Sequence, residues 1–410
     1  NCHTNTTSSD PAFQVERNEV RDFDVGLRME TTTGIVKIDT NTFQSSHQDA
    51  TAIVLHKEST TTQIIGNTME MENGTAIDVG EQSSEIVIED NSLTNSACGV
   101  NIQPLTECKM LGNTVKSTKL ATRIAGSASA RLERNTFEET VIAVSVEGTC
   151  VDHNEVRIDS NTFRSAVITV RDGAQPEISG NKFKVTNGDF ASGETEAVVS
   201  IFDSGGKVVE NHFVIESPSA GTAIKVCRVQ SISSGQSESS VTATEHTTKK
   251  QVSPRTSTSS GTGYSSKSLT ISTNTETSSS NGQPAIDHGF SPLILENTIR
   301  GFDHAIDING QRVTARNNKM YGPSGPPTSP TDHAEQRHPK LVDGLLPPTT
   351  TGIAVQQCET MLVTVEGNEI SHFGKGITIT NSRVGCNRNK IVESTTGIAI
   401  IQQRTEVELS

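Results

Sequence analysis

The sequence predicts an all-β protein that winds into a single-stranded parallel β-helix, a solenoid of about 13 coils. Three observations carry this prediction. An asparagine recurs along most of the chain in steps that are mostly about 20–26 residues, the length of one solenoid coil. Apolar residues flank each asparagine at fixed offsets, and a second short run of alternating type follows it. Runs this short and alternating indicate strands and leave no room for a helix.

The repeat is clearest in four segments in which an apolar residue stands three positions before an Asn and a Phe two positions after it. These segments are V-K-I-D-T-N-T-F (36–43), A-R-L-E-R-N-T-F (130–137), V-R-I-D-S-N-T-F (156–163) and P-E-I-S-G-N-K-F (176–183). Weaker copies extend the same register to thirteen asparagines: Asn18, Asn41, Asn67, Asn91, Asn113, Asn135, Asn161, Asn181, Asn211, Asn297, Asn318, Asn368 and Asn389.

We expect these asparagines to stack as a ladder that serves folding and has no chemical role. A side-chain amide can donate to the coil on one side and accept from the coil on the other, so a ladder satisfies corner groups that would otherwise be buried without partners. Asn also tolerates the left-handed backbone conformation that a tight corner often needs. We therefore expect the asparagines themselves to adopt that conformation.

The composition fits a narrow core. Of the 410 residues, 32% are hydrophobic and 3% aromatic, with no Trp. A conventional globule uses roughly 45–50% apolar residues on a count that includes Gly, whereas a solenoid core is one or two side chains wide. Phe137, Phe163, Phe183 and Phe213 fall on four consecutive coils and should form an internal aromatic stack.

The motif N-x-Φ followed by G-Φ-x-Φ, where Φ is apolar, resembles the right-handed β-helix repeats of the pectin-lyase-like superfamily and of NosD-type and carbohydrate-binding/sugar-hydrolase repeat proteins. The segment 171–183 is the closest match, and the resemblance covers about 13–230 and 290–405. It implies a right-handed coil with three sheets. It is unspecific for function, since that superfamily contains lyases, hydrolases, epimerases, adhesins and binding modules.

Two segments interrupt the repeat. A Ser/Thr-rich stretch at 231–283 is expected to be disordered, and its composition also suits an O-glycosylated tether. A Pro-rich insertion at 322–350 and smaller excursions at 44–50 and 186–196 leave from one corner, which we take as a pointer to a functional face. The predicted organisation is a tail or cap at 1–12, coils 1–9 at 13–230, the insertion at 231–283, coils 10–13 at 284–405 and a tail at 406–410.

The middle residue of each G-Φ-x-Φ strand should point outward. In neighbouring coils this row contains Asn101, Arg123, Ser145 and Thr169, which we expect to form a polar track about 4.8 Å per rung, a spacing that suits an extended sugar chain. Lys225 lies further along the row, and His333 in the 322–350 insertion completes the predicted binding residues. Arg123 is the one candidate for catalysis, as a cation that neutralises a uronate in a lyase.

No hydrolase signature is present. Polygalacturonase-like enzymes carry N-T-D, D-D, G-H-G and R-I-K, whereas this chain has N-T-F and lacks the other three, and it has no Asp-Pro-His-Asp motif of the epimerases. We expect no metal and no cofactor; Ca²⁺ is the one ion for which acidic pairs, Glu89-Asp90 and Asp22/Asp24, offer candidate ligands. The seven Cys are scattered without a C-x-x-C pair, so free buried thiols are expected.

The formal charge of −14 disfavours binding to nucleic acid or to anionic lipid, and no apolar run is long enough to span a membrane. The leading hypothesis is a non-catalytic module, part of a larger protein, that binds a polysaccharide or a surface protein. The alternatives are a polysaccharide lyase or uronate epimerase and a structural spacer. We expect an extracellular, cell-surface or periplasmic location.

Overall fold

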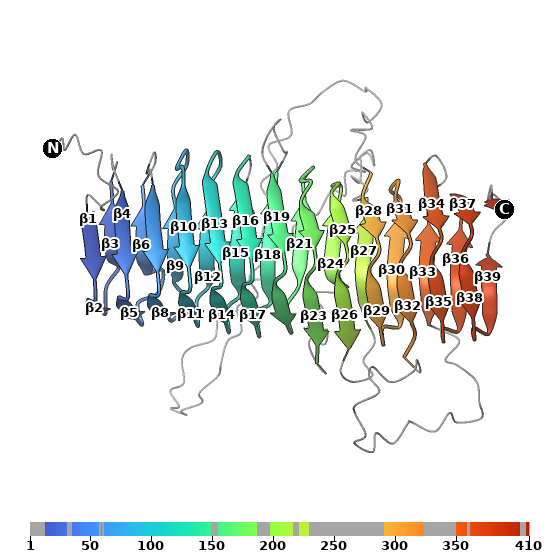
Figure 1. The fold of residues 1–410 in the computed structure, drawn as a ribbon, viewed down its shortest axis with the longest axis horizontal. Coiled ribbons are helices and arrows are strands. Elements are labelled where there is room, and N and C mark those ends of the chain that lie inside the picture. Colours follow the sequence, from blue (N-terminus) through green and yellow to red (C-terminus); the bar gives the residue numbers. More distant parts are fainter. Residues whose placement is uncertain are drawn as a thin grey trace, which may run out of the picture. The chain divides into compact units, whose positions relative to one another are not determined.

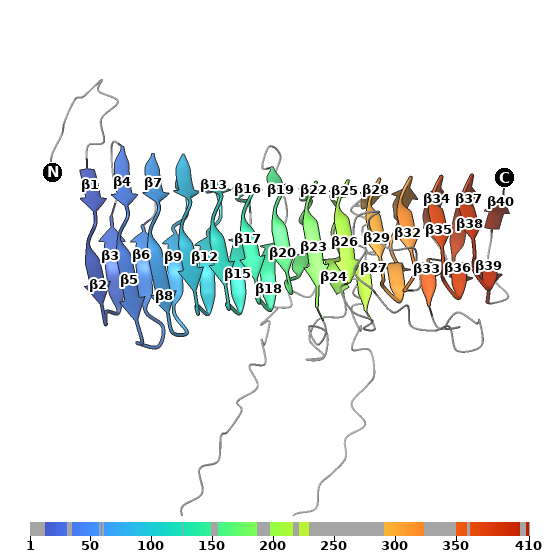
Figure 2. The same ribbon diagram turned by 60° about the horizontal axis from the view of Figure 1, so that its bottom comes forward.

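The computed structural model describes residues 13–30, 35–56, 59, 61–125, 127–148, 155–186, 197–215, 221–228, 291–323, 350–358, 361–401 and the backbone of 407–409. The chain divides into a β-helix unit, made of 1–229 and 289–410, and a unit at 230–288. The predictions for 1–12, for 231–283 and for most of 322–350, including His333, lie outside the described residues. Figures 1 and 2 show the β-helix unit in two views.

Each coil of the β-helix contributes one strand to each of three parallel sheets, so every strand pairs with the strand three places along the chain (Figure 1). Sheet A contains fourteen strands in the described part: β1 (Phe13–Glu16), β4 (Val36–Asp39), β7 (Thr62–Ile65), β10 (Ile86–Glu89), β13 (Glu107–Leu111), β16 (Ser129–Glu133), β19 (Val156–Asp159), β22 (Glu177–Ser179), β25 (Lys207–Val209), β28 (Leu293–Leu295), β31 (Thr314–Arg316), β34 (Leu362–Glu366), β37 (Arg383–Asn387) and β40 (Val407–Leu409).

Sheets B and C contain thirteen described strands each. Sheet B contains β2 (Glu19–Arg21), β5 (Thr42–Ser45), β8 (Thr68–Met71), β11 (Ser92–Thr94), β14 (Thr114–Lys116), β17 (Thr136–Glu138), β20 (Thr162–Arg164), β23 (Lys182–Val185), β26 (His212–Ile215), β29 (Thr298–Arg300), β32 (Lys319–Tyr321), β35 (Glu369–Ser371) and β38 (Lys390–Val392). Sheet C contains β3 (Val25–Met29), β6 (Thr51–Leu55), β9 (Thr75–Val79), β12 (Cys98–Ile102), β15 (Leu120–Ala125), β18 (Ile142–Glu147), β21 (Ile168–Arg171), β24 (Ala197–Phe202), β27 (Thr222–Cys227), β30 (His304–Asn309), β33 (Thr351–Gln356), β36 (Lys375–Thr380) and β39 (Thr396–Ile400).

The core is a set of columns in which like residues stack along the axis. The predicted aromatic column is confirmed: the ring centroids of Phe137 and Phe163 lie 5.0 Å apart, those of Phe163 and Phe183 4.6 Å, and those of Phe183 and Phe213 4.5 Å. The four rings are nearly parallel and at most 1% exposed. Because each coil buries only a few such side chains, the low apolar content suffices for the fold.

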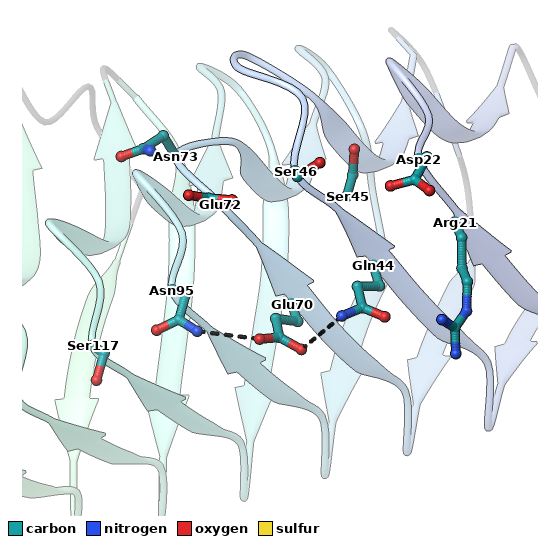
Figure 3. A pocket seen from close by; sticks show the side chains of 10 residues that line it. All are labelled: Arg21, Asp22, Gln44, Ser45, Ser46, Glu70, Glu72, Asn73, Asn95 and Ser117. Carbon is teal, nitrogen blue, oxygen red and sulfur yellow. Dashed lines mark hydrogen bonds between the residues drawn. The ribbon is translucent and has the colours of Figure 1, made fainter.

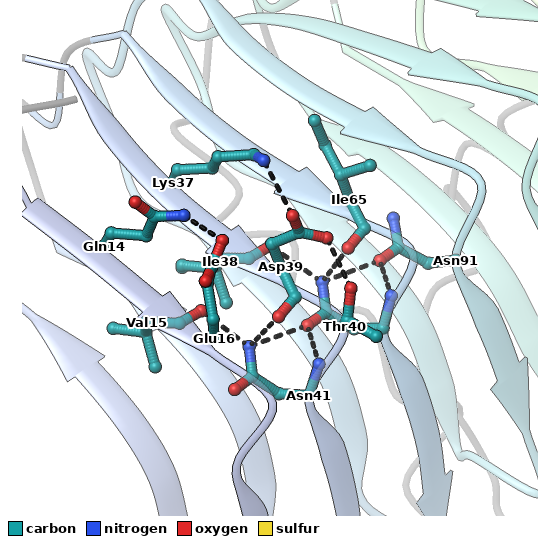
Figure 4. A network of polar contacts seen from close by, with 11 residues as sticks. Gln14, Val15, Glu16, Lys37, Ile38, Asp39, Thr40, Asn41, Ile65 and Asn91 are labelled. Atoms are coloured by element: carbon teal, nitrogen blue, oxygen red, sulfur yellow. Dashed lines mark hydrogen bonds and ion pairs between the residues drawn. The ribbon is translucent and has the colours of Figure 1, made fainter. Parts of the chain in front are cut away.

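The asparagine ladder is continuous through all thirteen predicted positions. In the twelve links from Asn18 to Asn389, the side-chain Nδ2 donates to the Oδ1 of the ladder asparagine in the next coil at 2.9–3.1 Å. The backbone N–H of the same residue donates to that oxygen at 2.8–3.0 Å. Asn41, for example, also donates to the carbonyl of Val15 in the preceding coil (Figure 4). The predicted satisfaction of the corner groups is therefore confirmed.

The left-handed conformation lies one residue earlier than we expected. None of the ladder asparagines has a positive φ, whereas the residue before each one has a φ between 53° and 65°. The reason is that the preceding residue makes the bend and points outward, while the asparagine already points into the ladder. The left-handed residues are Arg17, Thr40, Gly66, Asp90, Gly112, Arg134, Ser160, Gly180, Glu210, Glu296, Asn317, Gly367 and Arg388.

The insertions leave from defined corners. The excursions at 44–50 and 186–196 and the insertion at 322–350 each join a sheet B strand to a sheet C strand, at what we call the B–C corner. The segment after β27 instead joins sheet C to sheet A, and β27 pairs with β30 as if the chain were continuous. The insertions therefore interrupt the sequence and leave the stack of coils intact.

Four cysteines of the described residues are free thiols, as predicted: Cys98, Cys108, Cys358 and Cys386. Burial raises the pKa of Cys98 and Cys108 to about 12, so both thiols are protonated at neutral pH. Cys108 points into the core between Ile86 and Ala130 of the adjacent sheet A strands, where it packs as a small apolar side chain.

Candidate functional site

The predicted polar track lies in one row on sheet C. Asn101 pairs in register with Arg123, Arg123 with Ser145, and Ser145 with Thr169. Lys225 follows in the same row, two rungs beyond Thr169, and pairs with Asp307. The expected adjacency of these residues is therefore confirmed, whereas their expected role as an open binding track needs correction.

Ser145 and Thr169 are only 4% and 6% exposed, so the track is not an open groove at these two rungs. Ser145 donates from its hydroxyl to the carboxylate of Glu147 at 2.8 Å. Glu147 stands in the next outward row, and its long side chain folds back beside the shorter serine. The sequence pattern identifies which residues point outward, and it carries no information on how far a neighbouring side chain covers them.

Arg123 is held by the same carboxylate. Its Nη2 lies 3.1 Å from Oε2 of Glu147, and its Nε donates to that oxygen at 3.3 Å. On the other side, Asn101 donates from Nδ2 to Oδ1 of Asp78 at 2.8 Å. Arg123 therefore has a resident carboxylate partner where a uronate lyase would place the substrate carboxylate, and its catalytic role stays a prediction.

A hollow among the described residues lies on sheet B, at the B–C corner of the first five coils (Figure 3). It is a groove of about 640 Å³ that crosses the coils lengthwise, and we call it the polar groove. Its five rungs span about 19 Å at ~4.8 Å per coil. Its lining is Arg21, Asp22, Gln44, Ser45, Ser46, Glu70, Glu72, Asn73, Asn95 and Ser117.

Glu70 occupies the middle of the polar groove. Its Oε2 accepts a hydrogen bond from Nε2 of Gln44 at 3.3 Å, and its Oε1 accepts one from Nδ2 of Asn95 at 3.4 Å (Figure 3). The three side chains come from three successive coils, so the amides hold the carboxylate facing the groove. Carboxylate, amide and hydroxyl groups together offer both donors and acceptors, which are what a ligand rich in hydroxyl groups requires.

The sequence analysis pointed to the B–C corner but missed the residues of the polar groove. They stand three to six positions after the ladder asparagine, as Gln44 and Asn73 show, and these positions vary from coil to coil. The sequence feature that could have identified the groove is the excursion at 44–50, because Gln44, Ser45 and Ser46 begin this excursion and line the groove. A smaller groove of about 280 Å³ lies on sheet A near Glu85 and Lys109.

The described residues contain no cluster of three or more His, Cys, Asp and Glu side chains that could hold a metal ion. The acidic pairs Glu89-Asp90 and Asp22/Asp24 lie at the surface without such a cluster, and calcium binding stays untested. Within the same part of the chain, no helix is long and apolar enough to cross a membrane.

A family model described as the right-handed β-helix region matches residues 25–183. The strand pairing makes the described chain a parallel β-helix, and over the matched residues it is similar to that family. The description of the matched model gives a right-handed coil, which the spacing of the asparagines does not determine. The description names no ligand or reaction. No curated protein and no solved structure matches the chain.

Proposed function

We propose that the β-helix is a non-catalytic module that binds an extended, hydroxyl-rich polysaccharide in the polar groove. The observation that carries the proposal is the course of the groove, which crosses five successive coils and presents hydrogen-bonding side chains from each of them. An extended polymer matches such a site because every one of the five coils, about 4.8 Å apart, presents at least one hydrogen-bonding side chain along the groove. A groove of about five coils suits an oligosaccharide of about five sugars.

The charges of the groove argue for a neutral ligand. Asp22, Glu70 and Glu72 outnumber the single cation Arg21, and Arg21 is ion-paired with Glu19. A uronate chain would therefore meet a like charge at Glu70, where neutral sugar hydroxyls can donate to the carboxylate. No aromatic side chain lines the groove, so binding rests on hydrogen bonds and not on ring stacking.

The test is a panel of immobilised neutral and anionic polysaccharides probed with the full chain. We expect saturable binding to at least one neutral polymer, weakened about tenfold or more by Glu70→Ala. Glu89→Ala is the matched control, because Glu89 is also an outward strand carboxylate but lies on sheet A. The proposal fails if no neutral polymer binds saturably, or if Glu70→Ala and Glu89→Ala weaken binding equally.

A further inference from the structure

The second half of sheet B has an outward face of opposite character. The five consecutive strands β20, β23, β26, β29 and β32 contain no Asp or Glu. They present a set of basic side chains that we call the basic strip: Arg164, Lys182, Lys184, His212, Arg300 and Lys319. Figure 2 brings these strands forward. In a chain of net charge −14, such a concentration of one sign on one sheet is unusual.

The strip has two parallel rows that follow the axis. In the first row, Lys182 pairs in register with His212, His212 with Thr298, and Thr298 with Lys319. In the second row, Arg164 pairs with Lys184, and two rungs beyond Lys184 stands Arg300. The rungs are about 4.8 Å apart and the two rows about 7 Å apart.

Arg300 is the best-defined cation of the strip. Its guanidinium carbon lies 4.5 Å from the centroid of the Tyr321 ring, which fixes the plane of the group. Its buried Nε has no hydrogen-bond partner. A guanidinium whose plane is fixed is a preformed contact for an oxyanion through its two Nη groups, since the covered Nε cannot reach a ligand.

The pKa of the neighbouring His212 reflects the positive charges around it. The pKa of His212 is lowered first by burial and then by the positive charges of Arg300 and Lys182. The carboxylates nearest along the chain, Glu210 and Glu296, stand at the left-handed corner positions on the sheet A side. They do not enter the outward rows of the strip. Carboxylates do stand in register at its two ends: Glu138 is ion-paired with Arg164, and Glu369, the register partner of Lys319, is ion-paired with Lys390.

We propose that the basic strip binds a sulfated polysaccharide that lies along the axis of the β-helix. Its rungs repeat at about the spacing of successive sugars in an extended chain. The cations stand in two rows about 7 Å apart, with Lys182 and Lys319 in one and Lys184 and Arg300 in the other. This arrangement suits a polymer whose negative charges project from both sides of the chain, as sulfate esters on different ring positions do and the single carboxylate of a uronate does not. This second site is independent of the polar groove.

Dextran sulfate is the probe and unsulfated dextran its matched control. We expect the full chain to bind dextran sulfate in a salt-sensitive manner and to bind dextran at least tenfold more weakly. The double variant Lys182→Gln with Arg300→Gln should weaken binding about tenfold. Lys109→Gln with Arg131→Gln removes the same charge from sheet A and should change binding less than about twofold. Circular dichroism of both variants establishes that they fold.

Three outcomes would overturn the proposal: no binding of dextran sulfate at low salt, an equal loss in the two double variants, or tighter binding of polygalacturonate or single-stranded DNA than of dextran sulfate. Glu70→Ala separates this site from the polar groove, because it should leave dextran sulfate binding unchanged. Loss of neutral polysaccharide binding alone would therefore contradict only the proposal for the polar groove. Loss of dextran sulfate binding alone would contradict only the proposal for the basic strip.

Discussion

Asn211 donates from its side chain to Oδ1 of Asn297 at 3.1 Å, although the two residues are 86 positions apart in the chain. The bond has the same geometry as every other link of the ladder, so the segment between β27 and β28 is spliced into the β-helix without altering its stacking. Elsewhere the connection from sheet C to sheet A is as short as two residues, between Thr380 and Arg383.

Replacing 230–288 with a short Gly/Ser linker should therefore leave the fold intact. We expect the melting temperature of the shortened chain to lie within about 4 °C of that of the full chain, because the ladder and sheet hydrogen bonds of the described residues on both sides of the segment are kept. Differential scanning calorimetry measures the change. A loss of the cooperative transition would show that the excised segment supports the β-helix.

Removing a ladder amide from the middle of the stack should be costly. Asn161 donates to Leu132 and Asn181 and accepts from Asn135, and all these groups are buried. Asn161→Ala leaves several of them without partners, so we expect a loss of about 3 kcal/mol or more in the free energy of unfolding. Asn18→Ala, at the part-exposed end of the ladder, should cost less than about half as much. Chemical denaturation compares the two variants, and equal effects would contradict the ladder as a source of stability.

The aromatic column gives a second stability test. Phe183 contacts a parallel ring on each side and is 1% exposed, so Phe183→Ala should destabilise the protein by about 3–5 kcal/mol. Phe13 is 56% exposed, and Phe13→Ala serves as the control with an expected change under about 0.5 kcal/mol. Denaturant midpoints measure both, and a small effect at Phe183 would mean that the column is loosely packed.

The left-handed corner position predicts that two substitutions change the stability of the protein in opposite directions. Gly66 has a φ of 64° and no heavy atom closer than 3.8 Å to an added Cβ, so Gly66→Ala tests conformational strain alone and should cost about 1 kcal/mol. Glu296 has a φ of 56°, and Glu296→Gly relieves strain of about 1–2 kcal/mol against a smaller entropy loss. Thermal melts should therefore shift down for the first variant and up for the second. Destabilisation by Glu296→Gly would refute this account of the corner.

His212 predicts a pH dependence. Because its pKa in the folded state is lowered by burial and by Arg300 and Lys182, the unfolded chain binds the proton more tightly than the folded chain. The neutral histidine's contribution to stability is therefore present above the unfolded pKa, about 6.5, and is lost as the pH falls through the lower folded value. NMR titration should give a pKa below 6.5 that rises in Lys182→Gln. A value above 6.5 would contradict the positive field of the strip.

The sequence predicted the elements that repeat and missed those that depend on neighbours. The asparagine register, the phenylalanine column and the adjacency of Asn101 and Arg123 follow from spacing alone. The burial of Ser145 depends on the conformation of Glu147, and the polar groove depends on side chains such as Glu70 that differ from coil to coil. The left-handed position was misplaced by one residue because a corner motif identifies two adjacent candidates, and only the backbone shows which of them bends.

The most direct test of the functional account is hydrogen–deuterium exchange of the full chain, with and without a saturating amount of the neutral polysaccharide that binds most tightly in the panel. The polar groove predicts protection of 42–46, 68–73 and 92–95 on the sheet B side, with 98–102, 120–125 and 142–147 of sheet C unchanged. Protection confined to the sheet C segments, or no protection in either set, would contradict the assignment of the binding face to sheet B.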